Sequence, residues 1–143
     1  MSPRPCTAPA LAEPPIADLH LPAHSSYLAF ARLFVRRAAS ACGLDEGRSH
    51  ELEYAFNEAV TNAIRHGRPD ARGQIRLSAL WQGDRLTLAV HDSGTFVASL
   101  PGGAARDPAE GGRGLALMAT FADEVEVSNE PGATTVRVSK LRR

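Results

Sequence analysis

The sequence predicts an α+β fold, a two-layer α/β sandwich in which helices cover one face of a mainly antiparallel sheet. Three observations indicate this fold class. Apolar residues recur at helical spacing through much of the segment from residue 25 to residue 66. Two runs of alternating apolar and polar residues flank Gly83-Asp84, which is typical of a β-hairpin. Two further runs near the end of the chain flank Glu130-Pro131-Gly132.

Composition restricts the class of protein. The chain has 143 residues, of which 43% are hydrophobic, and this suffices for one domain with its own core. The 16 basic and 16 acidic residues give a formal net charge of zero, which argues against a nucleic-acid partner. Cys6 and Cys42 form no CxxC pair, so zinc is not expected. No run approaches the ~20 apolar residues of a membrane helix, and no signal-peptide pattern is present. We therefore expect a soluble, cytoplasmic protein that binds neither nucleic acid nor membrane.

The first elements are predicted from composition and helix-cap signals. Residues 1–15 are rich in proline and alanine, and we expect a disordered or extended lead-in there. Residues 16–21 alternate apolar and polar side chains and fit a short edge strand. A helix should then begin with Ser25 or Ser26 as its cap and end at Gly43.

A second and longer helix is predicted between Asp45, which can cap its start, and Gly67, which Pro69 follows closely. Its apolar residues keep the helical period and define one face. We expect that face to be buried against the sheet. The predicted core stripe comprises Leu52, Phe56, Ala59, Val60 and Ala63.

The second half of the chain alternates between strand patterns and glycine-rich or proline-rich segments. Loops longer than about 12 residues with no structure of their own are usually functional or mobile. The closing Lys140-Leu-Arg-Arg143 is expected to be a solvated tail. The predicted elements are strands over 74–81 and 86–91, a long loop over 97–111, a short helix over 115–121, and strands over 125–128 and 134–140.

Glu58, Asn62 and His66 follow one another at four-residue intervals, directly before Gly67. This spacing places the three side chains along one line of a helix, at the border of its apolar face. A carboxylate there can accept a hydroxyl proton. An amide oxygen can ligate Mg²⁺ together with phosphate oxygens and water. Taken alone, the same residues also fit a polar helix edge at which His66 and Gly67 merely end the helix.

Asp92-Ser-Gly94 follows the second strand of the predicted hairpin. An aspartate at a strand end can accept a hydrogen bond from an exocyclic amine, such as N6 of adenine. A glycine two residues later lets a flat ring approach the backbone. An ordinary Asp-Ser-Gly turn is the alternative interpretation of this segment.

Gly111-Gly112-Arg113-Gly114 precedes the predicted short helix. Glycines before a helix expose backbone N–H groups, and the helix N-terminus adds partial positive charge, so the segment suits a phosphate group. It is not the loop of P-loop proteins, because no Lys-Ser/Thr pair follows. A lone glycine cluster is weak evidence of a site.

The order of these segments resembles the GHKL (Bergerat-fold) ATPase superfamily, and most closely its serine protein kinase anti-sigma factors. The resemblance covers roughly residues 16–140, and it implies that residues 16–143 form a histidine-kinase-like ATPase domain. The N box of the family is similar to Glu58-Ala-Val-Thr-Asn62-Ala-Ile-Arg-His66-Gly67. Its glycine box and the strand that follows are similar to Gly112-Arg-Gly114-Leu-Ala-Leu-Met118 and Phe121-Ala-Asp123-Glu-Val125. Its terminal strand is similar to Ala133-Thr-Thr135-Val-Arg-Val.

The resemblance implies a role for each candidate site residue. Glu58 would be the catalytic general base and Asn62 the ligand of Mg²⁺. Asp92 and Gly94 would contact adenine, and residues 97–111 would form the ATP lid. The remaining expected contacts of ATP are His66, the backbone of Gly112, Gly114 and Leu115, and Thr134 and Thr135.

Two positions depart from the superfamily pattern, and both bear on ATP affinity. Phe96 stands where a second glycine is frequent, and Ala133 stands where a glycine usually precedes Thr134. No dimerisation helix with a phosphoacceptor histidine precedes the predicted domain, so we expect something other than a complete histidine kinase.

The resemblance implies an enzyme that transfers the γ-phosphoryl group of ATP to a serine or threonine of a STAS-domain anti-anti-sigma partner. The same protein would sequester a sigma factor, and phosphorylation would weaken the partner's binding by adding negative charge. A homodimer is compatible with this function. The alternative is a non-catalytic module that uses nucleotide only to set its shape and exchanges partners by mass action.

Overall fold

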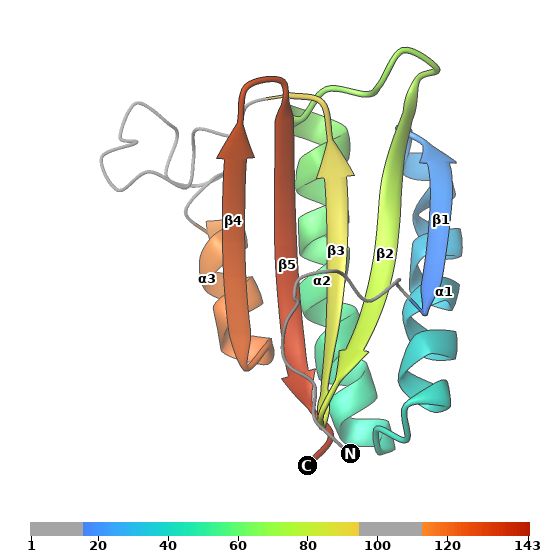
Figure 1. Ribbon diagram of the computed structural model, residues 1–143, viewed down its shortest axis with the longest axis vertical. Coiled ribbons are helices and arrows are strands. Elements are labelled where there is room, and N and C mark those ends of the chain that lie inside the picture. Colours follow the sequence, from blue (N-terminus) through green and yellow to red (C-terminus); the bar gives the residue numbers. More distant parts are fainter. Residues whose placement is uncertain (1–15, 95–112) are drawn as a thin grey trace, which may run out of the picture.

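The described residues, 16–94 and 113–143, form a five-stranded sheet and three α-helices that cover one of its faces (Figure 1). In this computed structural model every neighbouring pair of strands is antiparallel, in the order β1-β2-β3-β5-β4. The predicted fold class is confirmed. The strands are β1 (Ala17–Pro22), β2 (Gln74–Gln82), β3 (Arg85–Asp92), β4 (Glu124–Glu130) and β5 (Ala133–Leu141), and the helices are α1 (Leu28–Ala41), α2 (Glu46–His66) and α3 (Arg113–Phe121).

The first strand lies at the edge of the sheet, as predicted, but the predicted serine cap of the first helix is wrong. The ring of His24 accepts a hydrogen bond from the backbone N–H of Ser26 at 3.1 Å. The serines therefore lie inside a 3-10 turn, Ser25–Tyr27, and α1 begins only at Leu28. The acceptor for this N–H group is thus a histidine nitrogen, whereas we expected a serine hydroxyl to cap the start of the helix.

The second helix, α2, is the central helix of the layer and was predicted closely. Asp45 caps it, because its carboxylate accepts a hydrogen bond from the backbone N–H of Arg48 at 2.7 Å. All five residues of the predicted core stripe are buried. They pack with apolar side chains of β2, β3 and β5 in one core. The largest fully buried side chains include Phe56, Leu52, Ile75, Leu77, Leu86, Leu88 and Met118.

The last three elements extend beyond their predicted ends. α3 begins at Arg113, two residues earlier than predicted, and the ladder of β4 and β5 continues to the turn at Pro131-Gly132. The expectation of a solvated tail is wrong for Lys140, which is 5% exposed near the end of β5. In the part of the chain that is described, no helix is long and apolar enough to cross a membrane.

Candidate functional site

The last turns of α2, the end of β3 and the start of β5 meet around a small cavity of about 10 Å³. Asn62, Asp92 and Thr134, three of the candidate site residues, line it together. A space of this size suits one polar group and not a whole nucleotide. Its size and lining therefore fit one polar group of a ligand beside the carboxylate of Asp92. The other lining residues are Ala59, Ala63, Gly67 and Val136.

The carboxylate of Asp92 is held in one orientation by backbone groups. Its Oδ1 accepts hydrogen bonds from the N–H of Gly94 at 2.7 Å and from the N–H of Arg68 at 3.3 Å. The N–H of Ser93 also donates to the carbonyl of Arg68 at 2.7 Å. These bonds fix Oδ1 and leave Oδ2 to accept a hydrogen bond from a ligand.

Gly67 is required for this arrangement because of its close contacts. A Cβ at Gly67 would lie 2.6 Å from both the carbonyl oxygen of Ala63 and Oδ2 of Asp92. Its φ of −84° is open to any residue, so contact and not backbone conformation selects glycine here. The sequence indicated Gly67 only as a helix end, and it gave no signal for the role of the Arg68 backbone.

We expect Gly67→Ala to destabilise the protein by about 1–3 kcal/mol, the usual cost of forcing a methyl group into a packed site. The same methyl group should displace the Asp92 carboxylate and weaken the binding of adenine nucleotides. Thermal unfolding and calorimetric titration with ATP measure the two effects. Gly47→Ala is the matched control at the other end of α2, where the new Cβ would lie 3.6 Å from Oδ1 of Asp45, an ordinary contact distance. An unchanged melting temperature in Gly67→Ala would contradict this account of the contact.

Asn62 presents a buried amide to the first residues of α3. Its Nδ2 is buried and has no hydrogen-bond partner among the described residues. A Cβ at Gly114 would lie 2.8 Å from that atom, so only glycine lets the backbone of α3 come this close. A buried N–H group without an acceptor costs stability unless a ligand satisfies it. The pair therefore suits a phosphate oxygen that approaches the amide and the helix N-terminus.

The Asn62 amide suits Mg²⁺ when phosphates and water supply the other ligands of the ion. No group of three or more His, Cys, Asp or Glu side chains in the described part of the chain could hold a metal ion. Mg²⁺ usually keeps several waters and needs only one or two protein oxygens when phosphates supply the rest. The Asn62 amide oxygen can be that ligand, while its NH₂ group donates to a phosphate.

Glu58 and Asn62 lie one helical turn apart on α2, and both side chains are half-buried. His66 is the last residue of α2 and is exposed. Leu115 is partly buried and packs against the core, so its backbone is the part that could contact a ligand. The predicted line of polar residues along α2 thus meets the cavity beside Asp92 at Asn62 and reaches solvent at His66.

Thr134 and Thr135 point to opposite faces of the sheet, because successive strand residues alternate. Thr134 is 1% exposed and lines the cavity, and its hydroxyl lies 2.6 Å from the carbonyl oxygen of Gly94, to which it donates. Thr135 lies on the face without helices, where its hydroxyl is 3.0 Å from Nδ1 of His91. Thr134 therefore supports the Asp92 segment, whereas Thr135 does not reach the cavity.

The imidazole of His91 bridges two hydroxyl groups on this open face, since its Nε2 also lies 3.0 Å from the hydroxyl of Ser78. Burial, followed by the nearby charges of Arg76 and Arg137, lowers the pKa of His91 to about 4. The ring is therefore neutral at physiological pH. It orders the sheet beside Asp92 without adding charge.

Several predicted features lie outside the described residues. They are the lead-in over 1–15, Phe96, the loop over 97–111 and Gly112. The roles assigned to them stay predictions. A larger cavity, of about 460 Å³, lies toward the other end of α2 and is lined by Arg32, His50, Glu53, Tyr54 and Asn57. None of these five residues lines the cavity beside Asp92.

Comparison with known proteins defines the class of protein to which this chain belongs. Residues 21–140 match the family model of the histidine kinase-like ATPase domain. The chain is 30% identical to the serine-protein kinase RsbW of Bacillus subtilis, over 87% of this chain and 84% of that protein. It is 35% identical to the anti-sigma F factor of Bacillus cereus, over 86% of this chain and 90% of that protein.

Among solved structures, that of the RsbU and RsbW domains of a Mycobacterium tuberculosis protein has the same fold. The TM-score is 0.65 at 22% identity, over 89% of this chain and 33% of that one. The chain belongs to the histidine kinase-like (GHKL) ATPases and, within them, to the family of serine-protein kinase anti-sigma factors. The predicted family is confirmed, and membership implies the use of ATP.

Proposed function

We propose that this protein is an anti-sigma factor and an ATP-dependent serine/threonine kinase. Its substrate would be a STAS-domain anti-anti-sigma protein, and it would sequester a sigma factor when that partner is phosphorylated. The observation that carries the proposal is the convergence of Asn62, Asp92 and Gly114 at one end of α2. Relatives named as a serine-protein kinase and as an anti-sigma F factor support both activities. The homodimer compatible with the resemblance and the cytoplasmic location stay predictions.

Each residue has a distinct task in the proposed reaction. Oδ2 of Asp92 accepts a hydrogen bond from the exocyclic amine of adenine, and the backbone of Gly94 lies beside the ring. The Asn62 amide holds Mg²⁺ and a phosphate oxygen, and the N-terminus of α3 at Gly114 faces the phosphates. When bound, Mg²⁺ neutralises charge that develops on the phosphate oxygens.

Glu58 would accept the proton of the attacking hydroxyl. The serine or threonine oxygen of the partner forms a bond to the γ-phosphorus while the bond from that phosphorus to ADP breaks. The proton moves to the Glu58 carboxylate. The product carries a phosphoryl group whose negative charge weakens the partner's binding and leaves the kinase available to sigma.

The test of this function is transfer of label from γ-labelled Mg-ATP to the STAS protein encoded beside the kinase gene. We expect label on that partner and none on a variant in which alanine replaces its acceptor residue. Label on the alanine variant of the partner would point to a contaminating kinase. No transfer to any neighbouring STAS protein would support the non-catalytic module instead.

We expect Asp92→Asn to lower the affinity for ATP by about tenfold or more, which corresponds to about 1.4 kcal/mol. The asparagine oxygen can keep the two backbone bonds at Oδ1, and its NH₂ group then replaces Oδ2 and faces the amine of adenine. Calorimetric titration measures the loss. GTP offers a carbonyl at that ring position and should lose less affinity. Asp84→Asn, in the exposed turn at the other end of β3, is the control, and equal ATP affinity in Asp92→Asn and the parent would remove the adenine role.

A further inference from the structure

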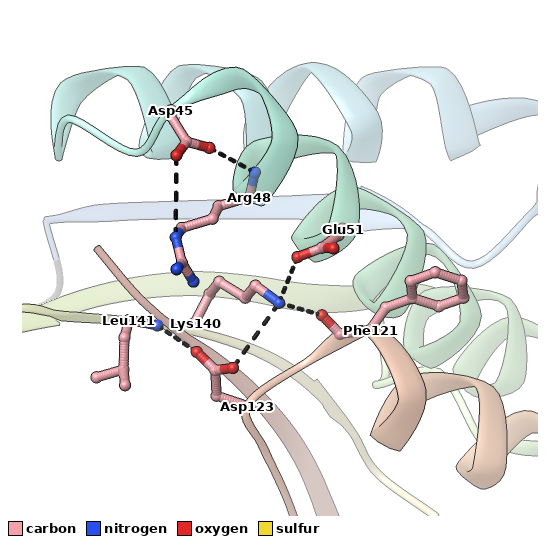
Figure 2. A network of polar contacts seen from close by, with 7 residues as sticks. All are labelled: Asp45, Arg48, Glu51, Phe121, Asp123, Lys140 and Leu141. Atoms are coloured by element: carbon pink, nitrogen blue, oxygen red, sulfur yellow. Dashed lines mark hydrogen bonds and ion pairs between the residues drawn. The ribbon is translucent and has the colours of Figure 1, made fainter. Parts of the chain in front are cut away.

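Lys140 is a buried lysine that joins three elements of the fold. Its Nζ lies 2.7 Å from the carbonyl oxygen of Phe121, 2.7 Å from Oε1 of Glu51 and 3.8 Å from Oδ1 of Asp123 (Figure 2). The side chain is only 7% exposed. Burying a cation is costly unless it is paired and hydrogen-bonded, so this arrangement needs its partners to stay in place.

Two of the three contacts of Lys140 are at the C-terminal end of α3 or just beyond it. Phe121 is the last residue of that helix, and its carbonyl is one of those that have no partner within a helix. The ring of Phe121 also stacks on Tyr54 of α2, with centroids 4.8 Å apart. Asp123, just beyond the helix, accepts a hydrogen bond from the N–H of Leu141 at 2.7 Å. The end of α3 is thus fixed to both α2 and β5.

The other end of α3 reaches the candidate nucleotide site. Gly114 packs directly on the Asn62 amide, so α3 lies antiparallel along α2, from Asn62 at one end to Tyr54 at the other. The helix has nine residues and spans about 13 Å at 1.5 Å per residue. A short helix moves as one body, so a shift at Phe121 is carried to Gly114.

We propose that Lys140 is a positioning residue for the phosphate end of the nucleotide site. It holds the C-terminal carbonyl of α3 and so sets where the backbone at Gly114 lies against Asn62. This inference rests on the proposed function, because it takes ATP phosphates to bind between these two residues. It goes further in assigning a task to a residue near the end of β5 that lies beyond the predicted site segment of that strand.

The adenine end of the site does not depend on Lys140. Asp92 is held by the backbone of Arg68 and Gly94, and Gly94 is in turn held by Thr134. None of these four residues is in α3. Loss of the Lys140 contact should therefore weaken the binding of phosphates and leave the binding of adenosine unchanged.

The experiment compares ATP and adenosine binding to Lys140→Met, in which an apolar chain of similar length replaces the lysine. We expect ATP affinity to fall by about tenfold, the size expected when a charge-assisted hydrogen bond that fixes a binding segment is lost. Adenosine affinity should stay within about twofold of the parent by nuclear magnetic resonance titration. Equal losses for both ligands, or no loss for either, would overturn the positioning role, since a general loss of stability affects both ends alike.

Two further variants make the comparison decisive. Glu51→Gln removes one charge from the network but keeps a side-chain oxygen that can accept from Lys140. The bond from Lys140 to Phe121 should therefore stay in place, and the ATP affinity should match the parent. Tyr54→Ala replaces Lys140→Met in the experiment if Lys140→Met does not fold. It removes the stacking contact with Phe121 at the same end of α3, and Tyr54 is exposed, so we expect weaker binding of ATP and unchanged binding of adenosine. If Tyr54→Ala then binds ATP as the parent does, the proposal fails. A parent protein that binds neither ligand would refute the proposed function instead.

Discussion

Glu58→Gln should lower phosphotransfer to the STAS partner by about 10²–10⁴-fold, the usual contribution of a general base. Glutamine keeps the size of the side chain but cannot take the hydroxyl proton. The residue lies one turn before Asn62 on α2 and does not line the cavity beside Asp92, so ATP affinity should change little. Single-turnover transfer and calorimetric titration on the same preparation measure the two effects.

The matched control for this prediction is Glu46→Gln, in the first turn of the same helix and far from its last turns. It should transfer phosphate at the parental rate. In a cell, Glu58→Gln should be held by unphosphorylated partner and leave sigma free. Equal transfer rates in Glu58→Gln and the parent would leave the kinase function standing and show that Glu58 is not its base.

Asn62→Ala should remove most of the gain in ATP affinity that Mg²⁺ provides, with a loss of about tenfold or more. Alanine lacks the amide oxygen that would ligate the ion. The fold should survive, because the buried Nδ2 of Asn62 makes no hydrogen bond with any described residue. Calorimetric titration of ATP with and without Mg²⁺ measures the effect.

Asn57→Ala is a close control for the metal assignment. Asn57 lies on the same helix and also has a buried amide atom, Oδ1, without a partner among the described residues. It lines the larger cavity toward the other end of α2, so its replacement should leave Mg-ATP affinity unchanged. If Asn62→Ala responds to Mg²⁺ as strongly as the parent does, the ion is held elsewhere.

The sequence predicted the helical part of the fold well, because α2 keeps one unbroken apolar period and has an aspartate at its start. It could not predict the cap of α1, where a histidine nitrogen precedes two serines that are better cap residues by type. The choice between Thr134 and Thr135 also lay beyond it. Both residues lie on one strand. A shift of that strand by one residue would turn Thr135 toward the cavity and Thr134 toward the open face of the sheet.

Tertiary contacts explain the other differences between the sequence-based predictions and the structure. Gly67 looks like a helix end in sequence, and only the fold brings Asp92 to within contact of it. Lys140 stands in the closing segment Lys140-Leu-Arg-Arg143, whose three basic residues are typical of a solvated tail. Its burial follows from the register of β5 against β3 and β4, which places it under α3.

The order of the strands also determines how the molecule can open. Asp92 and Thr134 lie on β3 and β5, which are interior strands with a hydrogen-bonded neighbour on each side and α2 across one face. α3 belongs to no ladder, although its Met118 is fully buried in the core and Lys140 holds its last carbonyl. The amides of β3 and β5 open only when their ladders break, so we expect them to exchange with solvent more slowly than the amides of α3.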